Sequence, residues 1–182
     1  MLNHCSKKSG FTLVEVVVVV AIMGVLSTMG VSSLRSAVIN TRMKDYSLNL
    51  AAFLERIGND ATRMSKEFCV KMADGNEQEL QIFEPVDGSC DVGKPSELYD
   101  VFNIESPAKF GCDDVDLGDF DGQDWAQNGD KFVPRIGLSA VPSEGYICMQ
   151  YGSKFIYWLI EKKKNANAIV PQWRAGDFWS RL

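Results

Sequence analysis

The apolar residues of this chain follow three successive patterns along its 182 residues. The first pattern is an apolar run from Phe11 to Val31, in which Glu15 is the only charged residue. An α-helix of that length rises about 30 Å, which matches the hydrocarbon core of a bilayer. We therefore expect residues 11–31 to form one helix that can lie across a membrane.

The second pattern begins after Val31, where apolar residues recur at steps of three or four and polar residues fill the positions between them. This spacing predicts an amphipathic helix over residues 32–66, which continues the first helix and packs its apolar stripe on a globular domain. The residues expected in that stripe are Leu34, Val38, Tyr46, Leu50, Phe53, Leu54, Ile57, Ala61, Met64 and Phe68.

The third pattern consists of short apolar segments separated by Gly, Pro and Asp, and it predicts a β-rich globular domain over residues 67–182. Pro134 marks one expected strand as an edge strand, and Gly152-Ser153 is expected as a two-residue type II′ turn. The predicted fold class is α+β, with one long N-terminal helix packed on an antiparallel β-sheet or on two sheets. The expected strands are residues 68–72, 79–83, 131–138, 146–151 and 154–160.

Glu15 is the most informative residue of the apolar run. A charged side chain inside a membrane segment costs roughly 2.5–3.5 kcal/mol on insertion scales, so its presence indicates a function. The alternative is that Glu15 lies close enough to the helix end to reach the lipid headgroups. Before it stands Lys7-Lys8-Ser9-Gly10, followed by Phe11-Thr12-Leu13-Val14-Glu15. The pair Lys7 and Lys8 is expected to stay on the cytoplasmic side of the membrane.

This segment resembles the class III signal peptide of type IV pilins and pseudopilins. The resemblance is sharp over about residues 7–35 and implies that residues 1–10 are a leader removed by a prepilin peptidase. That enzyme would cut after Gly10 and methylate the new terminal amine, which belongs to Phe11. Glu15 would pair with the terminal amine of a neighbouring subunit, which relieves the cost of the carboxylate when subunits assemble.

The resemblance also implies a location and partners. The protein would cross the bacterial inner membrane once, hold its globular domain in the periplasm, and then enter a pilus or pseudopilus. Its partners would be other pilin or pseudopilin subunits, the prepilin peptidase and the assembly platform in the inner membrane. The helix, cysteine-bearing strand and Asp-Gly turn over about residues 34–90 resemble H-type minor pseudopilins of type II secretion, which favours a minor subunit at the tip or in initiation.

Three alternatives remain open from the sequence. An ordinary secretory signal could be cut near Ser32-Ser33, although the apolar run is longer than the usual 7–15 residues of a signal core and no A-x-A site follows it. The chain could also be an uncleaved single-pass periplasmic protein. The third alternative is a binding module at a pilus tip, for adhesion or DNA uptake.

The charge and histidine content exclude several functions. The net charge is −5, and loss of two lysines with the leader would leave 17 basic against 24 acidic side chains, a net charge of −7. Such a surface repels phosphate backbones, so a nucleic-acid partner is not expected. The single histidine, His4, lies in the leader, which removes His-based nucleophilic sites and His-ligated zinc. Since no stretch indicates paired carboxylates or a Ser-Lys dyad either, we predict that the protein is not an enzyme.

Four cysteines follow the leader, and their even number in an oxidising compartment predicts two disulfides. Three pairings are open, and we favour the sequential one because it closes the shorter loops. The alternative is buried free thiols. The favoured bonds are Cys69–Cys90 and Cys112–Cys148.

Six aspartates fall within residues 113–124. Clustered carboxylates followed by glycine are ligands that calcium prefers, although the EF-hand pattern is not met. The alternative is a solvated acidic loop. No cofactor is expected apart from this candidate calcium site, whose ligands would be Asp114, Asp116, Asp119 and Asp121.

Overall fold

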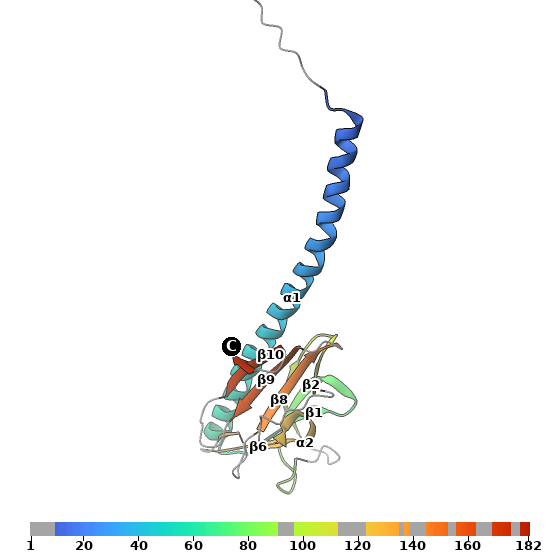
Figure 1. Cartoon of the computed structure of the whole chain (residues 1–182). Helices are drawn as coiled ribbons and strands as arrows, with labels where there is room; N and C mark the ends of the chain where they lie inside the picture. The colour runs from blue at the N-terminus through green and yellow to red at the C-terminus, as the bar shows by residue number, and fades with distance from the viewer. Residues whose placement is uncertain are drawn as a thin grey trace, which may run out of the picture. The chain divides into compact units, whose positions relative to one another are not determined.

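The computed structural model describes residues 10–90, 97–112, 123–134, 137–138, 145–152, 156–162, 169–175 and 179–182. The chain divides into two compact units, residues 1–40 and residues 41–182, and each is taken by itself. Figure 1 follows the chain from the long helix α1 into the strands.

Helix α1, Leu13–Met64, is continuous over 52 residues. Its first turn is fixed by Thr12, whose hydroxyl accepts a hydrogen bond of 3.3 Å from the amide of Glu15. Thr and Glu three residues apart are the two side chains of a capping box, which satisfies amides that the first helical turn leaves unpaired. The helix therefore begins inside the motif that the sequence analysis singled out.

The end of α1 is fixed by a left-handed residue. Ser65 has a φ of 53°, and the amide of Lys66 then donates to the carbonyl of Ala61 at 3.1 Å. This arrangement is a Schellman motif, which closes the last turn of a helix. The helix ends two residues before the expected boundary at residue 66.

The large apolar side chains described between Phe11 and Val31 are all exposed, by 45 to 83%. Over the described residues, no helix reaches the combination of length and hydropathy required of a membrane-crossing helix.

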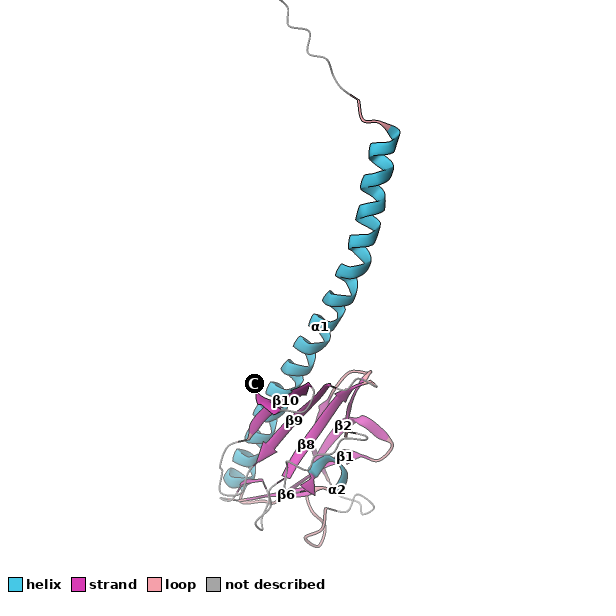
Figure 2. Ribbon diagram, viewed as in Figure 1, coloured by secondary structure: helices cyan, strands magenta, loops and turns pink. Residues whose placement is uncertain are grey.

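Residues 41–182 contain two β-sheets (Figure 2). The first sheet has five strands in the order β3-β2-β1-β6-β7, and each neighbouring pair is antiparallel. The strand β1 is central and carries a buried stretch from Phe68 to Val70. The bounds are β1 Phe68–Ala73, β2 Asn76–Phe83, β3 Leu98–Asn103, β6 Asp130–Val133 and β7 Gly137–Leu138.

The second sheet has the order β11-β10-β9-β8-β4, and the short strand β5 pairs with β8 in parallel. A one-turn helix, α2 (Trp125–Asn128), follows β5 directly. The strand β9 is central in its sheet. The bounds are β4 Ala108–Phe110, β5 Gln123–Asp124, β8 Gly145–Tyr151, β9 Ile156–Lys162, β10 Val170–Ala175 and β11 Trp179–Arg181.

The second part of α1 packs on the five-stranded sheet. The ring of Phe53 lies 5.3 Å from that of Phe102 in β3, and the hydroxyl of Tyr99 donates to Asp60 at 3.1 Å. On the other side of the sheet centre, Gly58 faces the ring of Phe132 in β6. The helix thus covers the sheet from β3 to β6, and the fold is α+β as predicted, with antiparallel sheets that are consistent with a pilin fold.

The predicted apolar stripe of the helix was correct in its second half and wrong in its first. Leu34 and Val38 are 67% and 46% exposed, so they are not core residues. The buried face begins at Ile39, one residue after Val38. The sequence pattern did not show this face because Met43 lies between two charged residues and Ser47 is polar. The buried residues of this face are Ile39, Met43, Ser47, Leu50, Ala51, Leu54, Ile57 and Ala61.

One predicted strand and one predicted turn differ from the structure. Residues 131–138 are not one strand, because the chain turns at Pro134 and β7 folds back on β6, with Val133 opposite Gly137. The two-residue turn at Gly152-Ser153 is also wrong. Gln150 pairs with Tyr157, and β9 begins only at Ile156, so four residues separate the strands.

Candidate functional site: the processing segment and the domain it carries

The junction between Gly10 and Phe11 is accessible. Gly10 is exposed, and a Cβ atom placed on it would meet no atom within 4 Å. Phe11 is 83% exposed and precedes the first helical residue, Leu13, by two positions. A peptidase could therefore reach this bond without unwinding α1. The predicted leader residues Lys7 and Lys8 lie outside the described residues.

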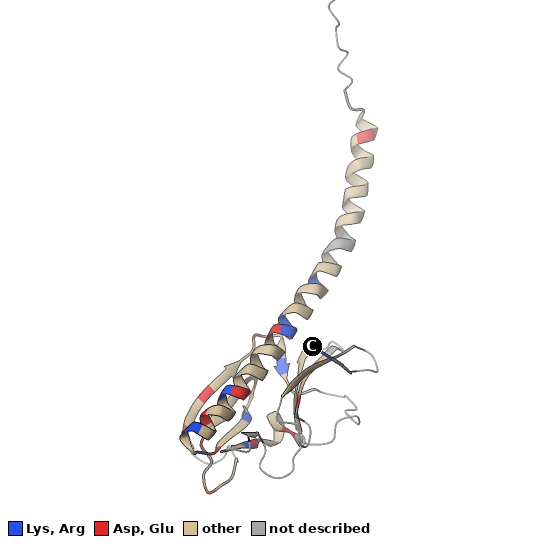
Figure 3. Ribbon diagram, turned by 90° about the vertical axis from the view of Figure 1, so that its left-hand side faces the viewer, with Lys and Arg blue, Asp and Glu red and all other residues tan. Residues whose placement is uncertain are grey.

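Glu15 occupies the third position of α1 and is exposed. A negative side chain in the first turn interacts favourably with the positive end of the helix dipole. In Figure 3 the first part of α1 carries a single acidic turn, whereas basic and acidic residues gather on its later turns. Glu15 is therefore a lone charge beside an exposed apolar surface, which is the setting its predicted pairing role requires.

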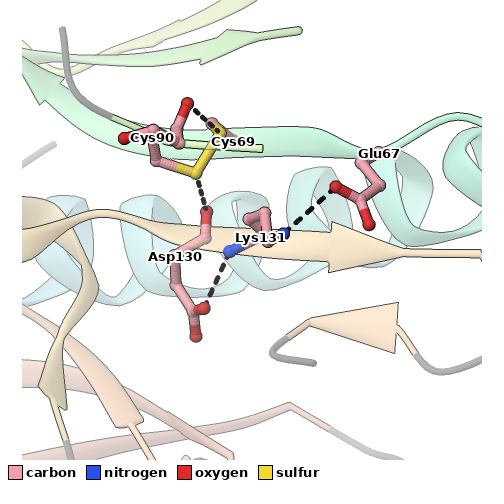
Figure 4. The surroundings of a disulfide bond; sticks show 6 residues. Glu67, Cys69, Cys90, Asp130 and Lys131 are labelled. Carbon is pink, nitrogen blue, oxygen red and sulfur yellow. Dashed lines mark hydrogen bonds and ion pairs between the residues drawn. A yellow bond between two sulfur atoms is a disulfide. The ribbon is translucent and has the colours of Figure 1, made fainter. Parts of the chain in front are cut away.

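The disulfides join separate elements of the β domain. Cys69 of β1 is bonded to Cys90, with Cα atoms 5.5 Å apart, and Cys112 is bonded to Cys148 of β8, with Cα atoms 5.7 Å apart. This is the pairing favoured from the sequence. The first bond fastens the turn at residues 86–89 to the five-stranded sheet (Figure 4). The second fastens the segment after β4 to the six-stranded sheet.

The candidate calcium ligands Asp114, Asp116, Asp119 and Asp121 lie outside the described residues. Within the described residues, no three side chains of His, Cys, Asp or Glu gather as a metal site would require.

The end of the acidic cluster has a structural role that the sequence did not reveal. Asp124 is buried and caps α2, its carboxylate accepting from the amide of Ala126 at 2.9 Å. Burial raises the pKa of the Asp124 carboxyl from 3.8 to about 6, and hydrogen bonds from the amides of Ala126 and Gln127 only partly oppose this. The negative charge of Asp124 also raises the pKa of Tyr146, in addition to the effect of burial.

We predict that Asp124→Asn makes the domain more stable at neutral pH. Because the folded-state pKa is raised, the stabilising contribution of Asp124 is complete below pH 3.8 and is lost as the pH rises through about 6. The shift corresponds to about 3 kcal/mol. Asparagine is an equally good N-cap and carries no charge. In urea unfolding between pH 4 and 7.5, the free energy of unfolding of the variant should rise relative to that of the wild type as the pH rises. A difference that does not depend on pH would contradict this.

Comparison with known proteins identifies the N-terminal segment. The family described as the prokaryotic N-terminal methylation motif matches residues 5–31. No curated protein matches the chain significantly. No solved structure matches it either. Residues 5–31 therefore carry a signal of the type IV pilin class, and this identification does not extend to the β domain.

Two features of the site were missed by the sequence analysis. The capping of α1 by the Thr12 hydroxyl could have been found, because T-x-x-E before an apolar run is the pattern of a capping box. The capping of α2 by Asp124 could not, because only the structure shows that this aspartate leaves the acidic segment and enters the core.

Proposed function

We propose that this protein is a prepilin-like structural subunit. A prepilin peptidase cuts it after Gly10 and methylates Phe11, and the mature subunit enters a type IV pilus or a type II secretion pseudopilus through the first part of α1. The observation that carries this proposal is the methylation motif at residues 5–31. It gains support from the accessible junction at Gly10 and from the exposed apolar side chains that follow it.

The exposed apolar surface of α1 requires a partner. The large apolar side chains described from Phe11 to Val31 are exposed by at least 45%, and apolar area in contact with water is unfavourable by roughly 25 cal/mol per Å². Lipid covers this surface before assembly, and the helices of neighbouring subunits cover it afterwards. The carboxylate of Glu15 then meets the terminal amine of the adjoining subunit, so the same segment serves as anchor and as contact.

We assign the inner membrane as the site of the unassembled subunit, with residues 41–182 in the periplasm. Alkaline carbonate extraction of membranes tests this assignment. A spanning subunit stays in the membrane pellet after extraction, whereas a peripheral or released protein appears in the supernatant. The two disulfides support an oxidising compartment for the domain.

A minor position in the filament is the finer part of the proposal. The β domain is held by two disulfides and has several long connections, which favours a specialised subunit over a repeating one. Electron microscopy of gold-labelled filaments tests it. Label confined to filament ends is expected, and label along the whole shaft would contradict the minor position.

A further inference from the structure

The structure contains a cleft beside the Cys69–Cys90 disulfide, and we propose that this cleft binds an acidic peptide segment of a neighbouring filament subunit. The cleft has a volume of about 410 Å³, which is the size of a small-ligand site. This inference rests on the proposed function for the identity of the partner, and on the side chains of the cleft for its chemistry. The residues that line it are Lys71, Gly88, Ser89, Cys90, Asn128, Gly129, Asp130 and Lys131.

The cleft places two lysines on one face of the five-stranded sheet. Cys69 and Lys131 are opposite each other in the β1–β6 ladder, so their side chains share a face. Lys71 stands two residues after Cys69 in the same strand and therefore shares that face too. Two ammonium groups and one disulfide thus line the same side of the sheet.

The one acidic residue of the lining turns its carboxylate away. Asp130 is opposite Val70, on the other face of the ladder, and its carboxylate accepts from the amide of Lys131 at 2.7 Å. Figure 4 shows the carbonyl of Asp130 directed towards Cys90 and its carboxylate directed to the opposite side of the strand. The sulfur of Cys90 lies 3.6 Å from that carbonyl oxygen, a contact without a hydrogen because a disulfide sulfur carries none.

The two lysines differ in what they already bind. Lys131 holds the carboxylate of Glu67 at 3.1 Å, which shows that an ammonium group of this face takes a carboxylate partner (Figure 4). Lys71 is half-buried and has no ion-pair partner among the described residues. An incoming acidic side chain would give Lys71 the kind of carboxylate partner that Lys131 already has.

The walls of the cleft are rigid, which favours binding because the cleft residues lose little conformational entropy when a partner binds. The disulfide fixes Cys90 against β1. Gly129, with a φ of 74°, lets the chain pass close to both neighbours, since a Cβ there would lie 3.4 Å from Lys71 and 3.5 Å from Cys90. The cleft is therefore formed before a partner arrives.

An acidic peptide is the occupant that the charges favour. The ammonium group of Lys71, beside the Lys131–Glu67 ion pair, and the main-chain groups of residues 88–90 and 128–130 match the side chain and backbone of a Glu- or Asp-bearing segment. Subunits of the acidic composition seen in this chain, with 24 acidic and 19 basic residues, offer many such segments. Two subunits with acidic surfaces repel each other over most of their area. Contact between them is therefore favoured where one subunit offers a lysine to a carboxylate of the other.

The test uses the full mature chain in detergent micelles and a fluorescein-labelled hexaglutamate peptide as the probe. Fluorescence anisotropy should show binding that weakens as salt is added. Lys71→Gln should weaken the affinity about tenfold, as expected when a charged hydrogen bond is lost. Lys71→Arg should restore most of the binding.

Lys66→Gln is the matched control, because it removes one positive charge from an exposed lysine that pairs with Glu84 outside the cleft. It should leave the affinity within about twofold. Absence of hexaglutamate binding, an equal loss in Lys66→Gln, or equal binding of hexaglutamine would overturn the proposal.

The N-terminal mass of the same preparations separates this proposal from the proposed function. A cut and methylated chain that does not bind the peptide refutes the cleft alone. A chain that still begins with its leader, in a strain with a working prepilin peptidase, refutes the proposed function and with it the subunit as partner.

Discussion

Replacing Glu15 with leucine is expected to reduce the amount of the protein in sheared filaments about a hundredfold, while cleavage after Gly10 continues. An unpaired charge in an apolar environment costs roughly 2.5–3.5 kcal/mol, and its pairing with a terminal amine would return about that amount on assembly. Leucine removes the carboxylate, so that gain disappears. Immunoblots of sheared and membrane fractions measure the ratio directly.

A second variant separates charge from helix capping. Glu15 stands three residues after Thr12, whose hydroxyl accepts from the amide of Glu15, and glutamine serves in a capping box as glutamate does. Glu15→Gln should therefore keep the helix start and still fail to assemble. If Glu15→Gln assembles normally, the residue acts as part of the cap and the pairing role is wrong.

Gly145→Ala is expected to destabilise the β domain by about 3 kcal/mol or more, which lowers the melting temperature by about 10 °C. A Cβ atom at Gly145 would lie 2.0 Å from Nε1 of Trp125, and no carbon atom can approach so closely. Trp125 is fully buried in α2 and cannot swing into solvent. Gly145 also pairs with Lys162 in β9, so the strand cannot shift freely.

Gly58→Ala is the matched control for this prediction. Its Cβ would meet the ring of Phe132 at 3.6 Å, which is ordinary van der Waals contact. Gly58 lies within α1, where alanine is favoured over glycine by about 1 kcal/mol. The same substitution should therefore stabilise the domain at position 58 and destabilise it at position 145. Equal melting temperatures for the two variants would contradict the packing around Trp125.

The sequence predicted the N-terminal segment well because its chemistry is local. Lys7 to Glu15 carry a motif whose residues have fixed spacing, and the match to the methylation motif at residues 5–31 agrees with it. The α+β class followed in the same way, from a long helical period and then short apolar segments. These features depend on neighbouring residues and not on long-range contacts.

The core could be predicted only in part, because the sequence does not distinguish an apolar residue that packs in the domain from one that is exposed on the helix. Leu50 and Leu54 were placed in the core correctly, whereas Leu34 and Val38 were placed there and are exposed. Ser47 is fully buried although it is polar. The period of a helix gives its apolar face but does not say where along the helix the domain begins.

The strands and the cleft depended on contacts that the sequence does not state. The strand β3, Leu98–Asn103, shows little alternation, and it forms because it pairs with β2 and lies against the helix. The cleft brings Lys71 together with residues 128–131, which are distant in the chain. The sequence favoured the Cys69–Cys90 disulfide, but the register of β1 on β6, which brings Lys131 beside Cys69, cannot be calculated from local pattern.

The mass of the N-terminal peptide of the purified protein is the most direct test of the central claim, that the chain is processed as a prepilin-like subunit. A processed subunit should give a peptide that begins with N-methylphenylalanine at Phe11, and the chain should keep residues 1–10 when Gly10→Val blocks the junction. A wild-type protein that still begins at Met1, or one cut near Ser32, would contradict it.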